Sequence, residues 1–169
     1  DLVVSAPYAS NMGKVYVIYS RPGFNAFDVN WLSNPNNTDM GFMLQGTLQS
    51  TFGYSVAGAK DFNGDGFSDI VIGAFRSNYA GINTGSAYAV YGNTTRATPT
   101  SLYVLTNTIR FDGNPSGQHA RLGYSVSSAG YFNNDSYADI LVSAAFQAGS
   151  TGTSNVGYTF LIYGKPQFT

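Results

Sequence analysis

The chain of 169 residues contains no cysteine and no glutamate, and only 10% of its residues are charged. Without cysteine there are neither disulfides nor zinc–thiolate sites, although this absence does not decide the compartment. An ordinary globular protein has roughly 25% charged residues. All 9 acidic residues are aspartate, which favours turns, whereas glutamate and lysine favour helices. These shortages argue against a helical protein.

The sequence also lacks a basic run and a long apolar run. Its net charge of −1 argues against the positive surface that binds nucleic acid. No stretch approaches the ~20 apolar residues of a membrane-spanning helix. We therefore expect no nucleic-acid partner and no membrane insertion.

What the sequence does contain is glycine, aromatic residues and an internal repeat. The 20 Gly, 13 Tyr and 12 Phe are typical of many β-strands joined by tight turns. Three motifs recur in the same order at intervals of about 70 residues. The first occupies 1–7, 69–75 and 139–145, the second 13–19, 85–91 and 157–163, and the third 52–58 and 122–128.

Each motif has the composition of a β-strand, and weaker strands are expected at 41–46 and 108–112. Four strands per repeat without helical periodicity predict an all-β fold of β-propeller-type blades, each with four antiparallel strands, in an incomplete ring. The expected units are a partial repeat at 1–50, a complete repeat at 51–120 and a partial repeat at 121–169. A β-sandwich is the alternative, but a sandwich does not require repeats in register.

Between the first two strands of the complete repeat lies an aspartate-rich segment, D-x-N-x-D-G-x-x-D. Calcium takes roughly six to eight hard oxygen ligands, more flexibly arranged than the strict octahedron of magnesium. A plain hairpin turn is the alternative, but it has no use for carboxylates that repel one another unless a cation lies among them. The candidate Ca²⁺ ligands are Asp61, Asn63, Asp65, Phe67 through its carbonyl, and Asp69.

The third repeat carries a degenerate copy of this loop, in which Asn133, Asp135 and Asp139 are retained. Tyr131 occupies the position of the first ligand, and Ser136 replaces the turn glycine. We expect the loop shape to be kept by hydrogen bonds from Asp135 and Asp139, with calcium binding weak or absent. The first repeat keeps only the last loop position, Asp1.

At this point the sequence resembles a known family. Phe52-Gly53, the aspartate segment and 72–75 (IGAF) are similar to the FG, cation and GAP elements of FG-GAP repeats, and Ser5-Ala6-Pro7 keeps the Ala-Pro of GAP. The resemblance implies the propeller of integrin α-subunits and their relatives, in which cation loops rigidify hairpins on one rim. It implies side-chain ligand roles for Asp61, Asn63, Asp65 and Asp69.

Other candidate residues are fewer. His119, the single histidine, is expected at the surface, and no G-x-S-x-G elbow or Walker-type loop is present, so we expect no enzyme. Trp31, with Phe24 and Phe27, either pins a long connector to the sheet or forms a sugar-stacking platform. The candidate glycosylation sites, for a chain secreted by a eukaryote, are Asn36, Asn93 and Asn134.

Three functions are open at this stage. The first is an extracellular or cell-surface structural and adhesive module stabilised by calcium. The others are a propeller face that binds carbohydrate or protein, and an accessory domain of a larger secreted hydrolase. Strand edges without partners at the two ends are expected to pair with flanking repeats of a longer chain or with other copies, and head-to-tail pairing that does not close would give a filament.

Overall fold

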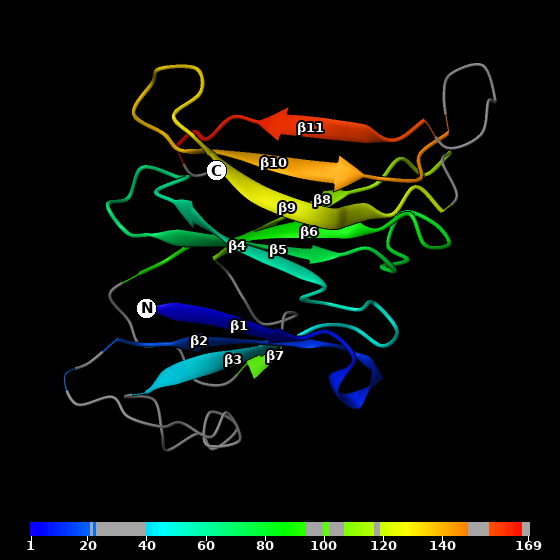
Figure 1. Ribbon diagram of the computed structural model, residues 1–169, viewed down its shortest axis with the longest axis horizontal. Coiled ribbons are helices and arrows are strands. Elements are labelled where there is room, and N and C mark those ends of the chain that lie inside the picture. Colours follow the sequence, from blue (N-terminus) through cyan, green and yellow to red (C-terminus); the bar gives the residue numbers. More distant parts are fainter. Residues whose placement is uncertain are drawn as a thin grey trace.

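The computed structural model describes residues 1–20, 22, 40–93, 100–101, 107–116, 119–148 and 156–166, and these residues form an all-β protein (Figure 1). The strands are β1 (Leu2–Ala6), β2 (Lys14–Ile18), β3 (Gly41–Gln45), β4 (Ser55–Lys60), β5 (Asp69–Ala74), β6 (Ser86–Val90), β7 (Thr100–Ser101), β8 (Thr108–Asp112), β9 (Leu122–Gly130), β10 (Asp139–Ala144) and β11 (Tyr158–Ile162). The helical content of this part of the chain is one short 3-10 turn, η1 (Ala9–Asn11). No helix among the described residues has the length and apolar character needed to cross a membrane.

The strands form three sheets that follow the predicted repeat. The central sheet contains β4, β5, β6 and β8 in that order, and every neighbouring pair is antiparallel. The third sheet contains β9, β10 and β11, again antiparallel. The first sheet contains β1, β2 and β3, and the short β7 adds to it parallel to β3. The prediction of propeller-type blades in an incomplete ring is confirmed, whereas β7 was not predicted.

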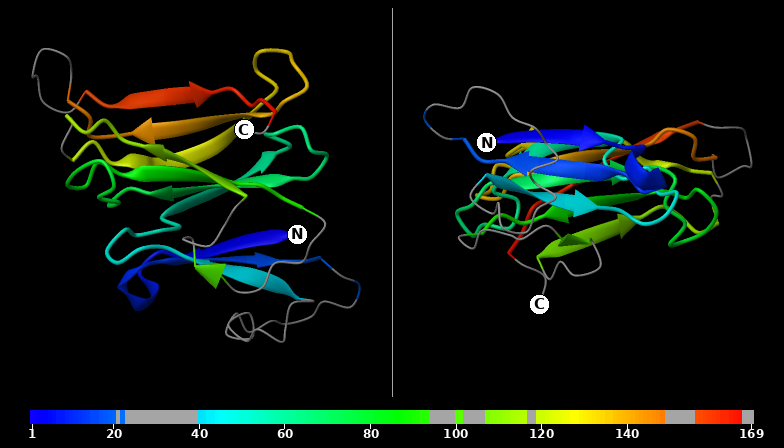
Figure 2. Two further views of the ribbon diagram at one scale, coloured as in Figure 1. Left: turned by 180° about the vertical axis from the view of Figure 1, so that it is seen from behind. Right: turned by 90° about the horizontal axis from the view of Figure 1, so that it is seen from below.

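The three sheets are stacked face to face, with the central sheet between the other two (Figures 1 and 2). The layer between the first and central sheets buries Val15, Leu44, Phe52, Ile72, Ala74, Tyr88 and Val90. The layer between the central and third sheets buries another apolar cluster, which includes Phe62, Val71, Leu122, Ile140 and Val142. The central sheet therefore has both faces covered by its neighbours, as a propeller blade does, and each outer sheet has one face covered.

Strand β5 shows why its sequence is a continuous apolar run. Ile72 points into the layer shared with the first sheet, and Val71 points into the layer shared with the third sheet. Both side chains are 0% exposed. Because successive side chains of a strand alternate between the two faces, a strand covered on both sides needs apolar residues at every position.

Glycine in the turn into β4 and at the start of β9 lets neighbouring blades approach closely. Gly123 has a φ of +80°, and a Cβ placed on it would lie 2.3 Å from the backbone oxygen of Ser86 in the central sheet. Gly53 has a φ of +83°, and its Cβ would lie 2.7 Å from Cγ2 of Val15 in the first sheet. Neither position has room for a side chain, which explains the glycine of the Phe52-Gly53 motif and of its copy.

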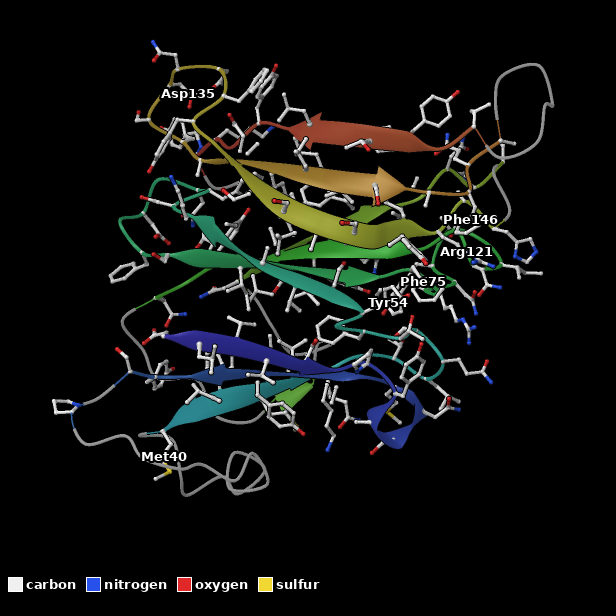
Figure 3. All side chains as sticks on the ribbon, viewed as in Figure 1. Met40, Tyr54, Phe75, Arg121, Asp135 and Phe146 are labelled. Atoms are coloured by element: carbon white, nitrogen blue, oxygen red, sulfur yellow. The ribbon has the colours of Figure 1, made fainter. Side chains whose placement is uncertain are left out.

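The loops gather at two rims. Loops 61–68 and 131–138, between the first and second strands of their sheets, lie at one rim, which we call the aspartate rim. Loop 7–13, between β1 and β2, and loop 75–85, between β5 and β6, lie at the other end of the strands, which we call the opposite rim. Figure 3 shows this separation, with Asp135 at the aspartate rim and Arg121 at the opposite rim.

Candidate metal loop

Loop 61–68 joins β4 to β5 at the aspartate rim. The pairing of the two strands shifts between Gly58 and Lys60, so that Lys60 lies opposite Asp69 where the loop begins and ends. Within the loop, Gly64 and Gly66 have φ values of +76° and +87°. These left-handed conformations favour glycine, and they curl the backbone back on itself.

Asp61 lies at the centre of this curl. Its Oδ1 accepts hydrogen bonds from the backbone N–H groups of Gly64 (2.7 Å) and Asp65 (3.0 Å). Its Oδ2 accepts one from the N–H of Gly66 (2.9 Å). A carboxylate offers about four acceptor positions, so these bonds fix the loop and still leave acceptor capacity on Asp61.

Asn63 and Asp65 are tied to each other on the same turn. Asn63 Nδ2 donates to Asp65 Oδ2 (2.8 Å), and the backbone N–H of Asp65 donates to Asn63 Oδ1 (3.2 Å). Asp65 Oδ1 also accepts the N–H of Phe67 (2.9 Å). Oxygen atoms from the first, third and fifth loop positions are therefore held along one short stretch of backbone.

Asp69 lies apart from these groups in a buried position, with its residue only 2% exposed. Its Oδ2 accepts the backbone N–H of Phe62 (2.8 Å), and its Oδ1 accepts the N–H of Gly92 (2.8 Å), which follows β6. Burial raises the pKa of the Asp69 carboxyl to about 6, the two N–H donors oppose this rise, and repulsion from Asp65 adds to it.

The donor set fits a hard divalent cation by its chemistry. Asp61, Asn63 and Asp65 present carboxylate and amide oxygens on one curled segment, and such oxygens are the ligands that Ca²⁺ prefers. The geometry differs from the expectation in one respect. Among the described residues, no three acidic or histidine side chains form a group that could hold a metal ion. Asp69, the last expected side-chain ligand, is directed at two backbone N–H groups.

Loop 131–138 in the third sheet repeats the hydrogen bonds that Asn63 and Asp65 make in loop 61–68. Asn133 Nδ2 donates to Asp135 Oδ2 (2.6 Å), and Asp135 Oδ1 accepts the N–H of Tyr137 (2.8 Å). Asp139, which is 0% exposed, accepts the N–H of Gly164 (3.0 Å). The loop shape expected from Asp135 and Asp139 is therefore present.

What the third loop lacks is the central carboxylate. Tyr131 stands at the position of Asp61, is 48% exposed and packs its ring 5.0 Å from Nζ of Lys60. Its backbone oxygen accepts the N–H of Asn134 (3.2 Å), so the first turn is closed by the main chain. The side-chain oxygens left for a cation come from Asn133 and Asp135 alone, a weaker donor set.

Sequence reasoning missed the backbone partners of the last loop position. Asp69 pairs with the N–H of Gly92, Asp139 with that of Gly164, and Asp1 Oδ1 with that of Ser20 (2.8 Å). The available signal was the small residue after the tyrosine that ends each second motif: Tyr19-Ser20, Tyr91-Gly92 and Tyr163-Gly164.

The remaining candidates are dispersed. His119 is exposed and its Nδ1 lies 3.3 Å from Nδ2 of Asn83, at the rim opposite to the aspartate loops. Asn93 and Asn134 are exposed. Asn36, Trp31, Phe24 and Phe27 lie outside the described residues.

Stacked antiparallel sheets that repeat one strand order, with an aspartate loop between the first two strands, define a protein of propeller-type blades. The family model described as FG-GAP repeat matches residues 52–92, which contain the aspartate loop. The chain belongs to the FG-GAP repeat family, in its integrin-α-like group.

Relatives among known proteins are integrin α chains. The chain is 35% identical over 85 residues to integrin alpha pat-2 of Caenorhabditis elegans (48% of this chain, 6% of the relative). It is 33% identical over 91 residues to integrin alpha-V of Gallus gallus (52% and 8%). It is 31% identical over 147 residues to integrin alpha-8 of Mus musculus (81% and 12%). The chain thus spans a small part of the length of these relatives.

Proposed function

We propose that this chain is a calcium-stabilised, non-catalytic structural and adhesive module of an extracellular or cell-surface protein. The observation that carries the proposal is the curl around Asp61, whose carboxylate is held by three backbone N–H groups beside the paired Asn63 and Asp65. The adhesive and extracellular parts are supported by membership of the integrin-α-like FG-GAP family.

Calcium would be held by Asp61, Asn63, Asp65 and the carbonyl of Phe67, with Asp69 at the end of the set. When bound, the cation supplies positive charge that offsets the repulsion between these carboxylates. The chain's own residues then do the structural work. Loop 61–68 fixes the hairpin of β4 and β5, and Asp69 joins that hairpin to the end of β6.

A non-catalytic role also fits the chemistry of the acidic residues. The carboxylates of Asp61 and Asp69 accept backbone hydrogen bonds with both of their oxygens. Acid–base chemistry would need carboxyl groups that are free to exchange protons with a substrate. Structural use of these groups is therefore the simpler interpretation.

Partners of the module are proposed from its outer face and its edge strand. On the first sheet, Leu2 is 55% and Val4 is 36% exposed, and both lie on the face away from the central sheet. On the third sheet, Tyr158 (40% exposed) and Phe160 (41%) lie opposite Ala144 and Val142, so they extend the inner apolar face along the edge strand β11. Apolar side chains exposed on an outer face or along an edge strand favour burial against another surface of the same kind. We propose flanking repeats or other copies of the chain as the covering surface, and a protein ligand as the partner of the assembled module.

The test is thermal unfolding of the chain, after chelation, with increasing Ca²⁺. At a calcium concentration ~100-fold above Kd, the free energy of unfolding rises by about 2.7 kcal/mol. Asp65→Asn should abolish the rise, whereas the matched change in the third loop, Asp135→Asn, should leave it intact. An unchanged melting temperature of the original chain with calcium, or equal loss in both variants, would refute the calcium site.

A further inference from the structure

The opposite rim contains a pocket of about 380 Å³, lined by loops of the first and central sheets and by Arg121, which precedes the third sheet. Its volume falls at the low end of the ~300–1,000 Å³ range of small-molecule sites. The lining includes two arginines and four side-chain amides: Arg76, Arg121, Asn11, Gln49, Asn78 and Asn83. Among the described residues that line it, none is acidic. The pocket is therefore basic and rich in neutral hydrogen-bonding groups, unlike the aspartate rim.

The pocket is built from equivalent positions of successive repeats. Asn11 and Asn83 precede the second motif in their repeats, and Thr51 and Arg121 precede the third motif. All four have left-handed backbones, with φ between 51° and 58°. Non-glycine residues in this region are strained and cluster at functional sites, so their gathering around one pocket points to a role in binding.

Backbone hydrogen bonds hold these strained segments in place. The N–H of Gln49 donates to the oxygen of Asn11 (2.7 Å), and the N–H of Arg121 donates to the oxygen of Asn83 (3.2 Å). Each bond joins a loop to the segment that enters the next blade. The pocket wall is therefore positioned before any ligand arrives, which reduces the entropy lost on binding.

The two arginines are oriented by aromatic rings. The guanidinium of Arg121 lies 4.2 Å from the ring centroid of Phe146 and 5.8 Å from that of Phe75, and the guanidinium of Arg76 lies 5.4 Å from Phe75. Figure 3 shows Arg121 beside Phe75 and Phe146, close to Tyr54. Within the described residues, neither arginine forms an ion pair with a carboxylate. Stacking leaves the N–H groups in the guanidinium plane available to an anion.

A row of rings supports this arrangement. Tyr54 packs against Phe75 with centroids 4.5 Å apart, Phe75 against Tyr124 at 5.4 Å, and Tyr124 against Phe146 at 5.7 Å. These rings come from both the central and the third sheets. Because edge-to-face contacts restrict the rings, they also restrict the cations stacked on them.

We propose that this pocket binds an acidic sugar, with Arg76 and Arg121 recognising the carboxylate of a uronic acid unit. A planar guanidinium matches a carboxylate with two parallel hydrogen bonds. Asn78 Oδ1 accepts the N–H of Asn83 (2.7 Å), and Asn83 Nδ2 lies 3.3 Å from His119 Nδ1. A carboxylate alone would, however, leave the amides of Asn11 and Gln49 without a role. Amides both donate and accept hydrogen bonds, as the hydroxyl groups of a sugar ring require. This site lies at the rim opposite to the calcium loop, and it does not depend on the function proposed for that loop.

The test is calorimetric titration of the chain with methyl β-glucuronide and methyl β-glucoside, which differ by the carboxylate. The glucuronide should bind saturably and with an affinity at least about tenfold higher than that of the glucoside. The reason is that a hydrogen bond to a charged group raises affinity by about tenfold or more. Arg76→Gln, at an exposed residue, should weaken glucuronide binding by about tenfold. Lys60→Gln removes one charge at the aspartate rim and should leave binding unchanged, as should Asp65→Asn.

Any one of five results would overturn the proposal, and the first four concern the small ligands and the control variant. These are no binding of glucuronide, equal binding of the glucoside, equal binding of acetate, and an equal loss in Lys60→Gln. Tighter binding of an aspartate-rich peptide than of glucuronide would also reject the sugar. If calcium did not raise the melting temperature of the chain but glucuronide still bound, only the calcium site proposed for loop 61–68 would be rejected. The two proposals can therefore fail separately.

Discussion

Asp69 joins two distant segments of the central blade through its carboxylate, which accepts the backbone N–H of Gly92 at 2.8 Å. Its other oxygen accepts the N–H of Phe62, also at 2.8 Å. In the third blade Asp139 makes the equivalent bond to Gly164 at 3.0 Å. The last position of the aspartate loop is therefore a structural clamp, because its carboxylate links the loop to the segment after β6 in the central blade and after β11 in the third blade.

The clamp predicts a stability loss that is independent of calcium. Asp139→Asn replaces an acceptor oxygen by an amide nitrogen beside a buried N–H donor, and such an unsatisfied group costs about 1–3 kcal/mol. Urea unfolding with and without calcium should give the same loss. Asp1→Asn, the same change at an exposed residue, should cost about 0.5 kcal/mol or less. A calcium-dependent loss in Asp139→Asn would contradict the structural role.

A second prediction restores what the degenerate loop lacks. Tyr131→Asp with Ser136→Gly gives the third loop the central carboxylate and turn glycine of its counterpart, whose remaining hydrogen bonds it already shares. The double variant should bind one more calcium ion than the original chain, as counted by isothermal titration. Tyr131→Phe with Ser136→Gly is the matched control and should add none. An unchanged stoichiometry in the double variant would show that Asp61 is not the decisive ligand.

A third prediction concerns the close approach of neighbouring blades. Gly123→Ala places a Cβ 2.3 Å from the backbone oxygen of Ser86 at a φ of +80°. Left-handed strain and overpacking each cost about 1–3 kcal/mol, so we expect a loss of roughly 3 kcal/mol in the free energy of unfolding. Gly58→Ala, where a Cβ meets nothing within 4 Å, should be close to neutral. Equal effects of the two changes would refute the steric argument.

The strands could be predicted where burial on both faces leaves a continuous apolar run. β5 was expected at 69–75 and is observed at Asp69–Ala74. β8, expected at 108–112 from its place before the third motif, is observed at Thr108–Asp112 although it is an edge strand of partly buried and exposed residues. The first strand of the central blade begins later than its motif, at Ser55, because Phe52 and Gly53 form the turn into it. β7 could not be predicted, because two residues that pair in parallel with β3 have no periodicity of their own.

The candidate site was less predictable than the fold. Spacing placed Asp61, Asn63 and Asp65 on one curl, since their hydrogen bonds are local. The spacing of the loop residues could not show that the Asp69 carboxylate points to the N–H of Gly92, because Gly92 follows β6 and lies 23 residues further along the chain. The pocket that contains Arg76 and Arg121 was equally hidden, because its walls come from loops of different repeats.

A fourth prediction follows from a buried phenol in the central blade. Burial raises the pKa of Tyr88 well above its usual value of 10.0. At a pH between 10.0 and this raised pKa, the Tyr88 phenol keeps its proton in the folded chain and loses it in the unfolded chain. The unfolded state therefore binds fewer protons than the folded state in this pH range. Stability is therefore fully present below about pH 10 and falls as the pH rises further, by up to about 1.4 kcal/mol per pH unit for one group.

Tyr88→Phe tests this assignment, since phenylalanine fills the same site and has no proton to lose. Urea unfolding at a series of pH values above 9–10 should give a shallower decline for the variant than for the original chain. A decline will persist, because burial also raises the pKa of Tyr16. If the two chains lost stability in parallel across this range, the alkaline decline would have to come from phenols other than Tyr88, and the ring would not be the buried group that its contact with Phe52 at 5.4 Å implies.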